Sequence, residues 1–197
     1  MSFKTLAALA GAAAILCGCA TAPSAPPSTA AVAPYAETLS VSGRLNVQYL
    51  QDGTQQSVTV RFDWQQDAQH TDVALFDPFG TKVAAIAVTP QGATLRQGGN
   101  KAPLSADSID ALSARALGWA LPVSGLRGWL QGHATAADGK PWSASPAHNE
   151  VTTPDGWHLR YVTWQAGSEL PRPLRIDADH PGGGGIQQMA LRIVIVE

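Results

Sequence analysis

The sequence predicts a mostly β domain of the α+β class, built on an antiparallel sheet. Apolar and polar residues alternate with a period of two over several short segments, which is the pattern of strands with one buried face. Glycine and proline account for 19 and 14 of the 197 residues and separate these segments. No strand-like segment alternates with crossover helices, as a parallel sheet would require. The strands are therefore expected to pair antiparallel.

The first eighteen residues are typical of an export signal. Lys4 supplies a positive charge, and residues 6–16 form an apolar core. Because a bilayer span needs about 20 apolar residues, this core fits a cleaved signal better than a membrane helix. The residues Leu16-Cys17-Gly18-Cys19 resemble the lipobox of bacterial lipoproteins. That resemblance implies cleavage before Cys19 and acylation of its thiol; the alternative is an ordinary signal with a chance cysteine.

Cysteine content and charge narrow the possibilities further. Cys17 would leave with the signal, so the processed chain could form no disulfide and must be held together by a hydrophobic core. The chain carries 13 Lys and Arg against 15 Asp and Glu, a net charge of −2. Such a balance offers no basic surface for nucleic acid.

Residues 20–38 are predicted to be a tether between Cys19 and the domain. Four prolines stand there among alanine, serine and threonine. Such a stretch buries too little apolar surface to offset the entropy of ordering it. We expect a semi-extended spacer that reaches at most ~60 Å, at roughly 3.1 Å per residue. The folded domain is expected to span residues 39–197.

The clearest local signal is a hairpin at the start of the domain. Apolar residues alternate over residues 39–49 and again over 58–65, and Asp52-Gly53 between them is typical of a tight turn. Asp77-Pro78-Phe79-Gly80 has the residue order of a type I turn between two later strands. Further strands, each bounded by turn residues, are predicted near residues 73–76, 82–88, 93–96, 157–165, 173–177 and 187–196.

Two helices are predicted in the middle of the chain. The first is expected to be capped by Ser105 and stopped by Gly118, with apolar residues at helical spacing between them. The second is expected from Pro122 to about Gln131, and Gly132 closes it. Two apolar helices within an antiparallel meander can lie across one face of a curved sheet.

No pattern of catalytic or metal-binding residues is present. The five histidines lack metal-ligand spacing. Asp177-Ala178-Asp179-His180 is the one acidic cluster with an imidazole, and because it precedes four glycines a solvated loop is favoured there over a metal site. The glycine run lacks the Lys and Ser/Thr of a phosphate loop. The sequence therefore predicts no enzyme, no metal and no cofactor.

Several motifs follow one another in order through the domain. They are Ser42-Gly43-Arg44-Leu45, Arg61-Phe62-Asp63-Trp64-Gln65-Gln66, Asp77-Pro78-Phe79-Gly80, the helical block of residues 117–132, Leu170-Pro171-Arg172-Pro173 and the apolar C-terminal strand. Together they resemble the LolB family of lipoprotein-localisation proteins. Ala20 rather than Asp follows Cys19, which in enterobacterial-type sorting implies release to the outer membrane.

The resemblance implies a fold and a function. The fold is an unclosed antiparallel β-barrel of about 10–11 strands, with two or three helices covering an apolar cavity. The function is to accept the acyl chains of lipoproteins from the periplasmic carrier LolA and to insert the lipoproteins into the outer membrane. The protein would be a monomer on the periplasmic face of that membrane, held by Cys19. The alternatives are a lipid-anchored structural or assembly protein that binds a protein partner, and a glycolipid-binding lipoprotein of similar fold.

The resemblance also implies site residues. Bulky apolar groups on the concave sheet face or the helices are expected to line the cavity, namely Trp64, Trp119, Leu121, Leu126, Trp129 and Leu130. The alternative is that each is ordinary core. In the family, the loop matching Asp77, Pro78, Phe79 and Gly80 carries a protruding apolar residue, usually Leu, that enters the bilayer surface. Phe79 is expected to do so here, unless it folds back on the sheet.

Overall fold

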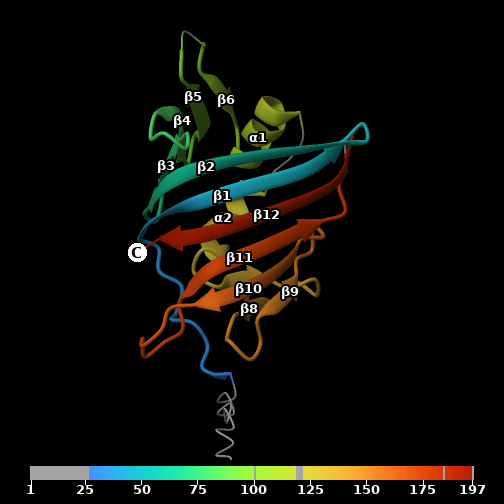
Figure 1. Ribbon diagram of the computed structural model, residues 1–197. Coiled ribbons are helices and arrows are strands. Elements are labelled where there is room, and N and C mark those ends of the chain that lie inside the picture. The colour runs from blue at the N-terminus through green and yellow to red at the C-terminus, as the bar shows by residue number, and fades with distance from the viewer. Residues whose placement is uncertain (1–26, 100, 119–121, 184, 197) are drawn as a thin grey trace, which may run out of the picture.

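The computed structural model describes residues 27–99, 101–118, 122–183 and 185–196. The predicted mostly β fold is confirmed, because ten strands form one antiparallel sheet in the order β6-β5-β4-β3-β2-β1-β12-β11-β10-β9 (Figure 1). These strands are β1 (Leu39–Gln51), β2 (Thr54–Gln66), β3 (Thr71–Phe76), β4 (Lys82–Thr89), β5 (Gly92–Gln97), β6 (Leu104–Ala106), β9 (Glu150–Thr152), β10 (His158–Trp164), β11 (Pro173–His180) and β12 (Ile186–Val196). Within the described residues β6 and β9 are the two edges, so the sheet is not closed into a barrel.

Long strands from the two ends of the domain meet in the middle of the sheet. β1 pairs with β2 without interruption from Leu39↔Gln66 to Gln51↔Thr54, and the Asp52-Gly53 turn has positive φ at both residues, as a tight hairpin requires. On its other side β1 pairs with β12, from Ser42↔Val196 to Gln51↔Ile186. The predicted hairpin is therefore confirmed, and it forms the centre of the sheet.

Two helices, α1 (Ile109–Leu117) and α2 (Val123–Trp129), lie on one face of this sheet (Figure 1). The predicted N-cap of the first helix is wrong. Ser105 lies in β6, opposite Thr94 of β5, and the cap is Ser108, whose Oγ accepts a hydrogen bond from Ala111 N at 3.1 Å. Residues 104–106 extend the sheet instead, because the backbone of β5 offers them hydrogen-bond partners that a helix start lacks.

The end of α1 agrees with the prediction. Gly118 adopts the left-handed conformation at φ 81°, and its N–H donates to Ala114 O. No helix in the described part of the chain has the length and apolarity needed to cross a membrane.

Besides β6, three short strands have no counterpart in the sequence predictions. β7 (His133–Thr135) pairs with β8 (Pro141–Ser143) as a separate hairpin, and β9 forms one edge of the large sheet. Each has only three residues, which are too few to show a period of two.

One half of the molecule is a solid core. Leu159, Tyr161 and Ile176 on β10 and β11 are 0 % exposed. The Tyr161 ring stacks on Trp142 with centroids 5.7 Å apart, and its hydroxyl donates to Trp129 O at 3.2 Å. Burial raises the pKa of this hydroxyl. The aromatic side chains packed over β10 and β11 leave this half filled.

The described part of the predicted tether, residues 27–38, lies on the domain. Val32 is 7 % exposed, and its N–H donates to Ala144 O at 2.9 Å. Further along, Ala36 exchanges two hydrogen bonds with the Gln131 side chain, at 2.9 and 3.0 Å. Gly132 permits the contact, because a Cβ there would lie 2.7 Å from Val32 Cγ1. The expectation of a free spacer, based on the entropy of ordering, failed because the backbone of this stretch forms hydrogen bonds with the domain.

Candidate functional site

An apolar hollow lies between the concave face of the sheet and the two helices. Its volume is about 300 Å³, at the lower end of the range for ligand pockets. Strands β1 to β5, together with β12, α1 and α2, provide its walls. From β1 and β2 the hollow is lined by Leu45, Val47, Tyr49, Val58, Val60, Phe62 and Trp64. The hollow therefore presents almost only aliphatic and aromatic groups to an occupant.

The side chains around the hollow explain why it stays open. Leu45, Leu75 and Ile86 point inward from neighbouring strands but are only half-buried. α1 packs against the sheet only near its β5–β6 edge, where Ile109 and Leu112 join Ala93 and Leu95 of β5 in a separate apolar cluster. The two layers are thus packed at one edge and apart over the middle.

The lining of the hollow is partly open to solvent towards one end of the central strands. Val58 lines it and is still 49 % exposed. Val58 and its partner Val47 lie towards the Asp52-Gly53 end of the β1–β2 hairpin. Antiparallel pairing points the β3–β4 loop towards this same end of the strands, whereas the start of β1 and the β10–β11 loop lie at the opposite end.

The six residues predicted for the cavity lie in different places. Trp64, Leu126 and Leu130 line the hollow. Trp129 does not: it is 4 % exposed in the solid core, with its ring centroid 6.0 Å from that of Trp157. In this structure Trp129 therefore packs as core, which is the alternative given for it from the sequence. Trp119 and Leu121 lie outside the described residues.

Most of the lining was missed by sequence reasoning. Val47, Leu75, Ile86, Leu95 and Leu112 all contribute to it. Four of them occupy inward positions of strands, and the same period of two that identified the strands could have named them. The tryptophans were predicted because their side chains are large, but a hollow is lined by smaller side chains that leave space.

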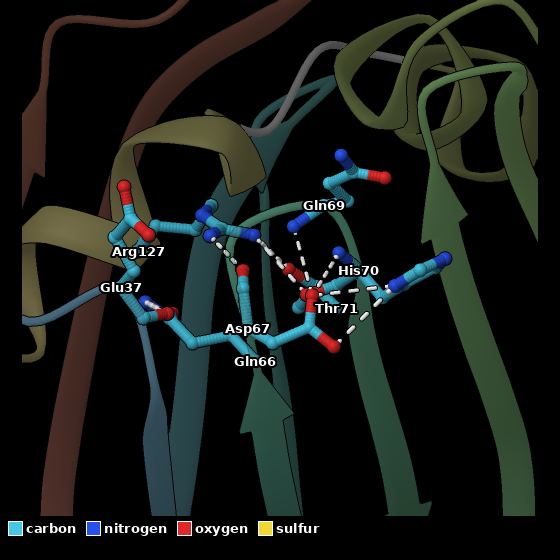
Figure 2. Close-up of polar contacts among 7 residues, drawn as sticks. All are labelled: Glu37, Gln66, Asp67, Gln69, His70, Thr71 and Arg127. Carbon is cyan, nitrogen blue, oxygen red and sulfur yellow. Dashed lines mark hydrogen bonds and ion pairs between the residues drawn. The ribbon is translucent and has the colours of Figure 1, made fainter.

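A polar network holds α2 against the sheet (Figure 2). The Arg127 guanidinium donates to Asp67 O at 2.6 Å, to Thr71 Oγ1 at 2.5 Å and to His70 O at 3.3 Å. Asp67 in turn accepts hydrogen bonds from the Gln69 and His70 backbone N–H groups, which lower the pKa of its carboxyl. Arg127 therefore fixes the helix over the hollow to the β2–β3 turn.

The β3–β4 loop holds an aromatic ring in solvent. Asp77 Oδ1 accepts hydrogen bonds from Phe79 N at 2.9 Å and Thr81 N at 2.8 Å, and Gly80 N donates to Asp77 O at 3.0 Å. The predicted turn is confirmed. Phe79 is 94 % exposed, so it does not fold back on the sheet. Exposing a Phe forgoes roughly 1.5–3 kcal/mol of burial, which is unusual for a ring held by an ordered turn.

The acidic cluster near the C-terminus is a structural ion-pair network. Contrary to the predicted solvated loop, β11 continues to His180, and Asp177 is 7 % exposed. Burial alone would raise the pKa of its carboxyl, but hydrogen bonds from Arg175 and Arg192 outweigh this and lower it. Across the described ranges, no group of three His, Cys, Asp or Glu side chains is placed to hold a metal.

The family model and the curated relatives indicate one family. The family model described as "Outer membrane lipoprotein LolB" matches residues 37–197. An outer-membrane lipoprotein LolB of Cupriavidus pinatubonensis is 36% identical over 162 residues, which are 78% of this chain and 76% of the relative. The corresponding protein of Bordetella petrii is 37% identical over 185 residues, covering 92% and 89%. A LolA superfamily protein of Nitrosomonas europaea gives a TM-score of 0.45 at 10% identity, over 84% and 86% of the two chains.

Proposed function

This chain belongs to the LolB family of outer-membrane lipoproteins, and from that premise we propose that it accepts acylated lipoproteins from the carrier LolA and inserts them into the outer membrane. One observation supports the proposal most strongly. β3 and β4 both line the apolar hollow, and the loop that joins these two strands carries an aromatic ring that is 94 % exposed. An acyl chain leaving the hollow would therefore emerge beside the group that enters the bilayer.

The hollow is the proposed site for cargo acyl chains. Its walls carry the aliphatic and aromatic groups that such a chain needs, and Trp64, Leu126 and Leu130 are among them. Since about 300 Å³ is small for an acyl ligand, we propose that α1 and α2 move away from the sheet as chains enter. A rival function that needs no lipid cavity leaves the hollow unexplained.

Hydrophobic free energies explain how delivery can proceed without a nucleotide. Burial of one 16-carbon chain is worth about 12 kcal/mol, and three chains would exceed 30 kcal/mol. Non-covalent affinities level off near −18 to −21 kcal/mol, so no cavity matches the bilayer for three chains. A hollow that binds slightly better than the carrier, beside a membrane that binds better still, makes each transfer downhill.

The proposed anchor is the lipid on Cys19, which lies outside the described residues. A Cys19→Ala chain with a generic cleavable signal is expected to be a soluble, folded periplasmic protein. Cell fractionation with a high-salt wash checks this. Recovery of the variant in the outer-membrane fraction would show that another part of the chain holds the membrane.

Phe79→Glu tests the delivery step. Because Phe79 is 94 % exposed, the melting temperature and uptake from LolA are expected to change little. Delivery into outer-membrane vesicles should collapse, since a carboxylate cannot enter the apolar boundary. A matched control is Leu170→Glu, because Leu170 is 44 % exposed in the β10–β11 loop at the opposite end of the strands.

The two variants must differ for the proposal to stand. If Phe79→Glu delivers cargo normally, or if Leu170→Glu loses delivery equally, the insertion device lies elsewhere. A fall of many degrees in the melting temperature of Phe79→Glu would instead identify Phe79 as a structural residue.

A further inference from the structure

Two arginines face each other on the convex side of the sheet. Arg44 on β1 is directly opposite Arg61 on β2. Their neighbours Leu45 and Val60 line the hollow, so the two arginines belong to the other face, where both are exposed. Like charges directly opposite each other destabilise a sheet. Placing two arginines opposite each other therefore lowers the stability of the sheet, and the fold does not need this pair.

Neither guanidinium is neutralised by the protein. In the part of the chain that the structure describes, the ion pairs involve other residues, and neither guanidinium forms a hydrogen bond. The carboxylate nearest along β2 is that of Asp63, which accepts a hydrogen bond from Ser42 Oγ at 2.8 Å. Elsewhere on this face, Arg175 and Arg192 share Asp177. The Arg44–Arg61 pair thus differs from Arg160, Arg175 and Arg192, which gather around the Asp177 carboxylate.

A small pocket lies between these two arginines and the Phe79 loop. Its volume is about 150 Å³, and it is lined by Arg44, Thr59, Val60, Arg61 and Pro78. Pro78 precedes Phe79 in the loop. Guanidinium groups and a hydroxyl are the donors that bind phosphate best, because Arg presents a planar fork of N–H groups. We propose that this pocket binds the phosphate of a phospholipid headgroup while Phe79 is in the membrane.

The depth of the pocket below the loop tip fits that assignment. Arg61 is opposite Phe76 of β3, three residues before Phe79. Three residues of chain span at most ~11 Å, at about 3.6 Å each. Each headgroup layer of a bilayer is roughly 5–7 Å thick, and interfacial groups enter about 5–10 Å. With the Phe79 ring at the hydrocarbon boundary, the two arginines would lie at the level of the phosphates.

The inference rests on the proposed membrane contact of Phe79 and adds a chemical partner to it. A ring alone leaves the protein free to rotate about the loop, whereas two arginines beside it fix which face of the sheet meets the headgroups. The concave face, with the hollow, then keeps one orientation towards the bilayer during delivery.

Vesicle binding of the Cys19→Ala chain tests the inference, since no acyl anchor then obscures it. Arg44→Gln and Arg61→Gln are expected each to weaken binding to vesicles containing phosphatidylglycerol about fivefold, and the double variant about 25-fold, at low salt. Arg172→Gln is the matched control, because it removes the same charge from the exposed β10–β11 loop at the opposite end of the strands. That variant should bind as the parent does.

Stability and competition give independent readouts. Arg61→Gln should keep or raise the melting temperature, because it relieves a like-charge contact; a fall would overturn the inference in favour of a structural role. Inorganic phosphate at millimolar concentration should not displace the protein from vesicles. Displacement that the double variant abolishes would mean that the pocket takes free phosphate, which overturns the lipid assignment.

Failure of this inference can be told apart from failure of the proposed function. If Phe79→Glu loses vesicle binding while the double arginine variant keeps it, the phosphate site is wrong and the insertion loop stands. If the arginine variants lose binding only as much as Arg172→Gln does, net charge alone explains the effect and the site is wrong. If Phe79→Glu keeps its binding, the insertion loop itself fails.

Discussion

The two halves of the sheet follow the same alternating pattern but are filled differently. On β10 and β11 the inward side chains of Leu159, Tyr161 and Ile176 are completely buried. On β1 and β3 the inward Leu45 and Leu75 remain half-buried around the hollow. The difference lies in the covering layer. Aromatic rings close the first half, whereas the second is covered by two short helices with the hollow between them and the sheet.

This contrast shows how one domain can be both stable and open. Engineered cavities cost about 24 cal/mol per Å³, so an empty, enclosed hollow of about 300 Å³ would cost on the order of 7 kcal/mol. That cost is comparable to the whole stability of an ordinary domain. The filled half must therefore supply most of the stability, and the open half most of the binding.

Truncation in the filled half should have the largest effect. Leu159→Ala is expected to lower the free energy of unfolding by about 2–5 kcal/mol, because Leu159 is 0 % exposed and its neighbours cannot collapse into the space. Leu45→Ala, in the open half, should cost less than about 1 kcal/mol, since the side chain already borders a void. Urea denaturation of both variants measures the difference. Equal losses would show that the halves are packed alike.

The outer face of the filled half should show an intermediate effect that depends on pH. Arg175 and Arg192 hold the pKa of Asp177 below its usual value, despite the burial that would raise it. A lowered folded pKa stabilises the protein above the unfolded pKa of about 3.9, and this contribution is lost as pH falls through the folded value. At pH 7, Asp177→Asn is expected to cost about 1–3 kcal/mol.

The measurement is the free energy of unfolding as a function of pH between neutrality and strong acid. Asp177→Asn should lose stability at neutral pH and show a shallower fall in acid than the parent. Asp179→Asn is the matched control, because Asp179 is two residues along β11 and forms none of the ion pairs found among the described residues. If both variants behave alike, the arginine network contributes nothing specific.

The same contrast separates what the sequence predicts from what it does not. Long strands were predictable because apolar residues alternate over residues 39–49 of β1 and 58–65 of β2, and the Phe79 turn because Asp, Pro and Gly each have a position in it. The hollow was not predictable in detail. Alternation shows which side chains point inward, but whether they meet a partner depends on residues far away in the chain.

Individual residues show which positions the local sequence pattern did not predict. Trp129 and Leu126 both lie on the apolar stripe of α2, yet one faces the filled half and the other the hollow. Ser105 has the side chain of a helix cap but joins β6, because β5 is there to pair with it. The bond between Val32 and Ala144 was invisible to a local reading, since the two residues are far apart in the chain. In each case a tertiary contact outweighed the local signal.

Enlarging a side chain should have the smallest effect on stability in the open half and the clearest effect on binding. Leu45→Trp adds a ring where the structure has space, so the free energy of unfolding is expected to change by less than about 1 kcal/mol. The comparison variant is Ala178→Leu in the filled half. Ala178 is 0 % exposed, and overpacking there should cost about 1–3 kcal/mol.

Binding of a fluorescent fatty acid should fall several-fold in Leu45→Trp, because the ring occupies volume that the acyl chain needs. Binding should be unchanged in Ala178→Leu once the folded fraction is matched. Should Leu45→Trp bind the probe as tightly as the parent, the acyl chain lies elsewhere on the molecule. Should it unfold as readily as Ala178→Leu, the space between sheet and helices is already filled in solution, and the contrast between the two halves is lost.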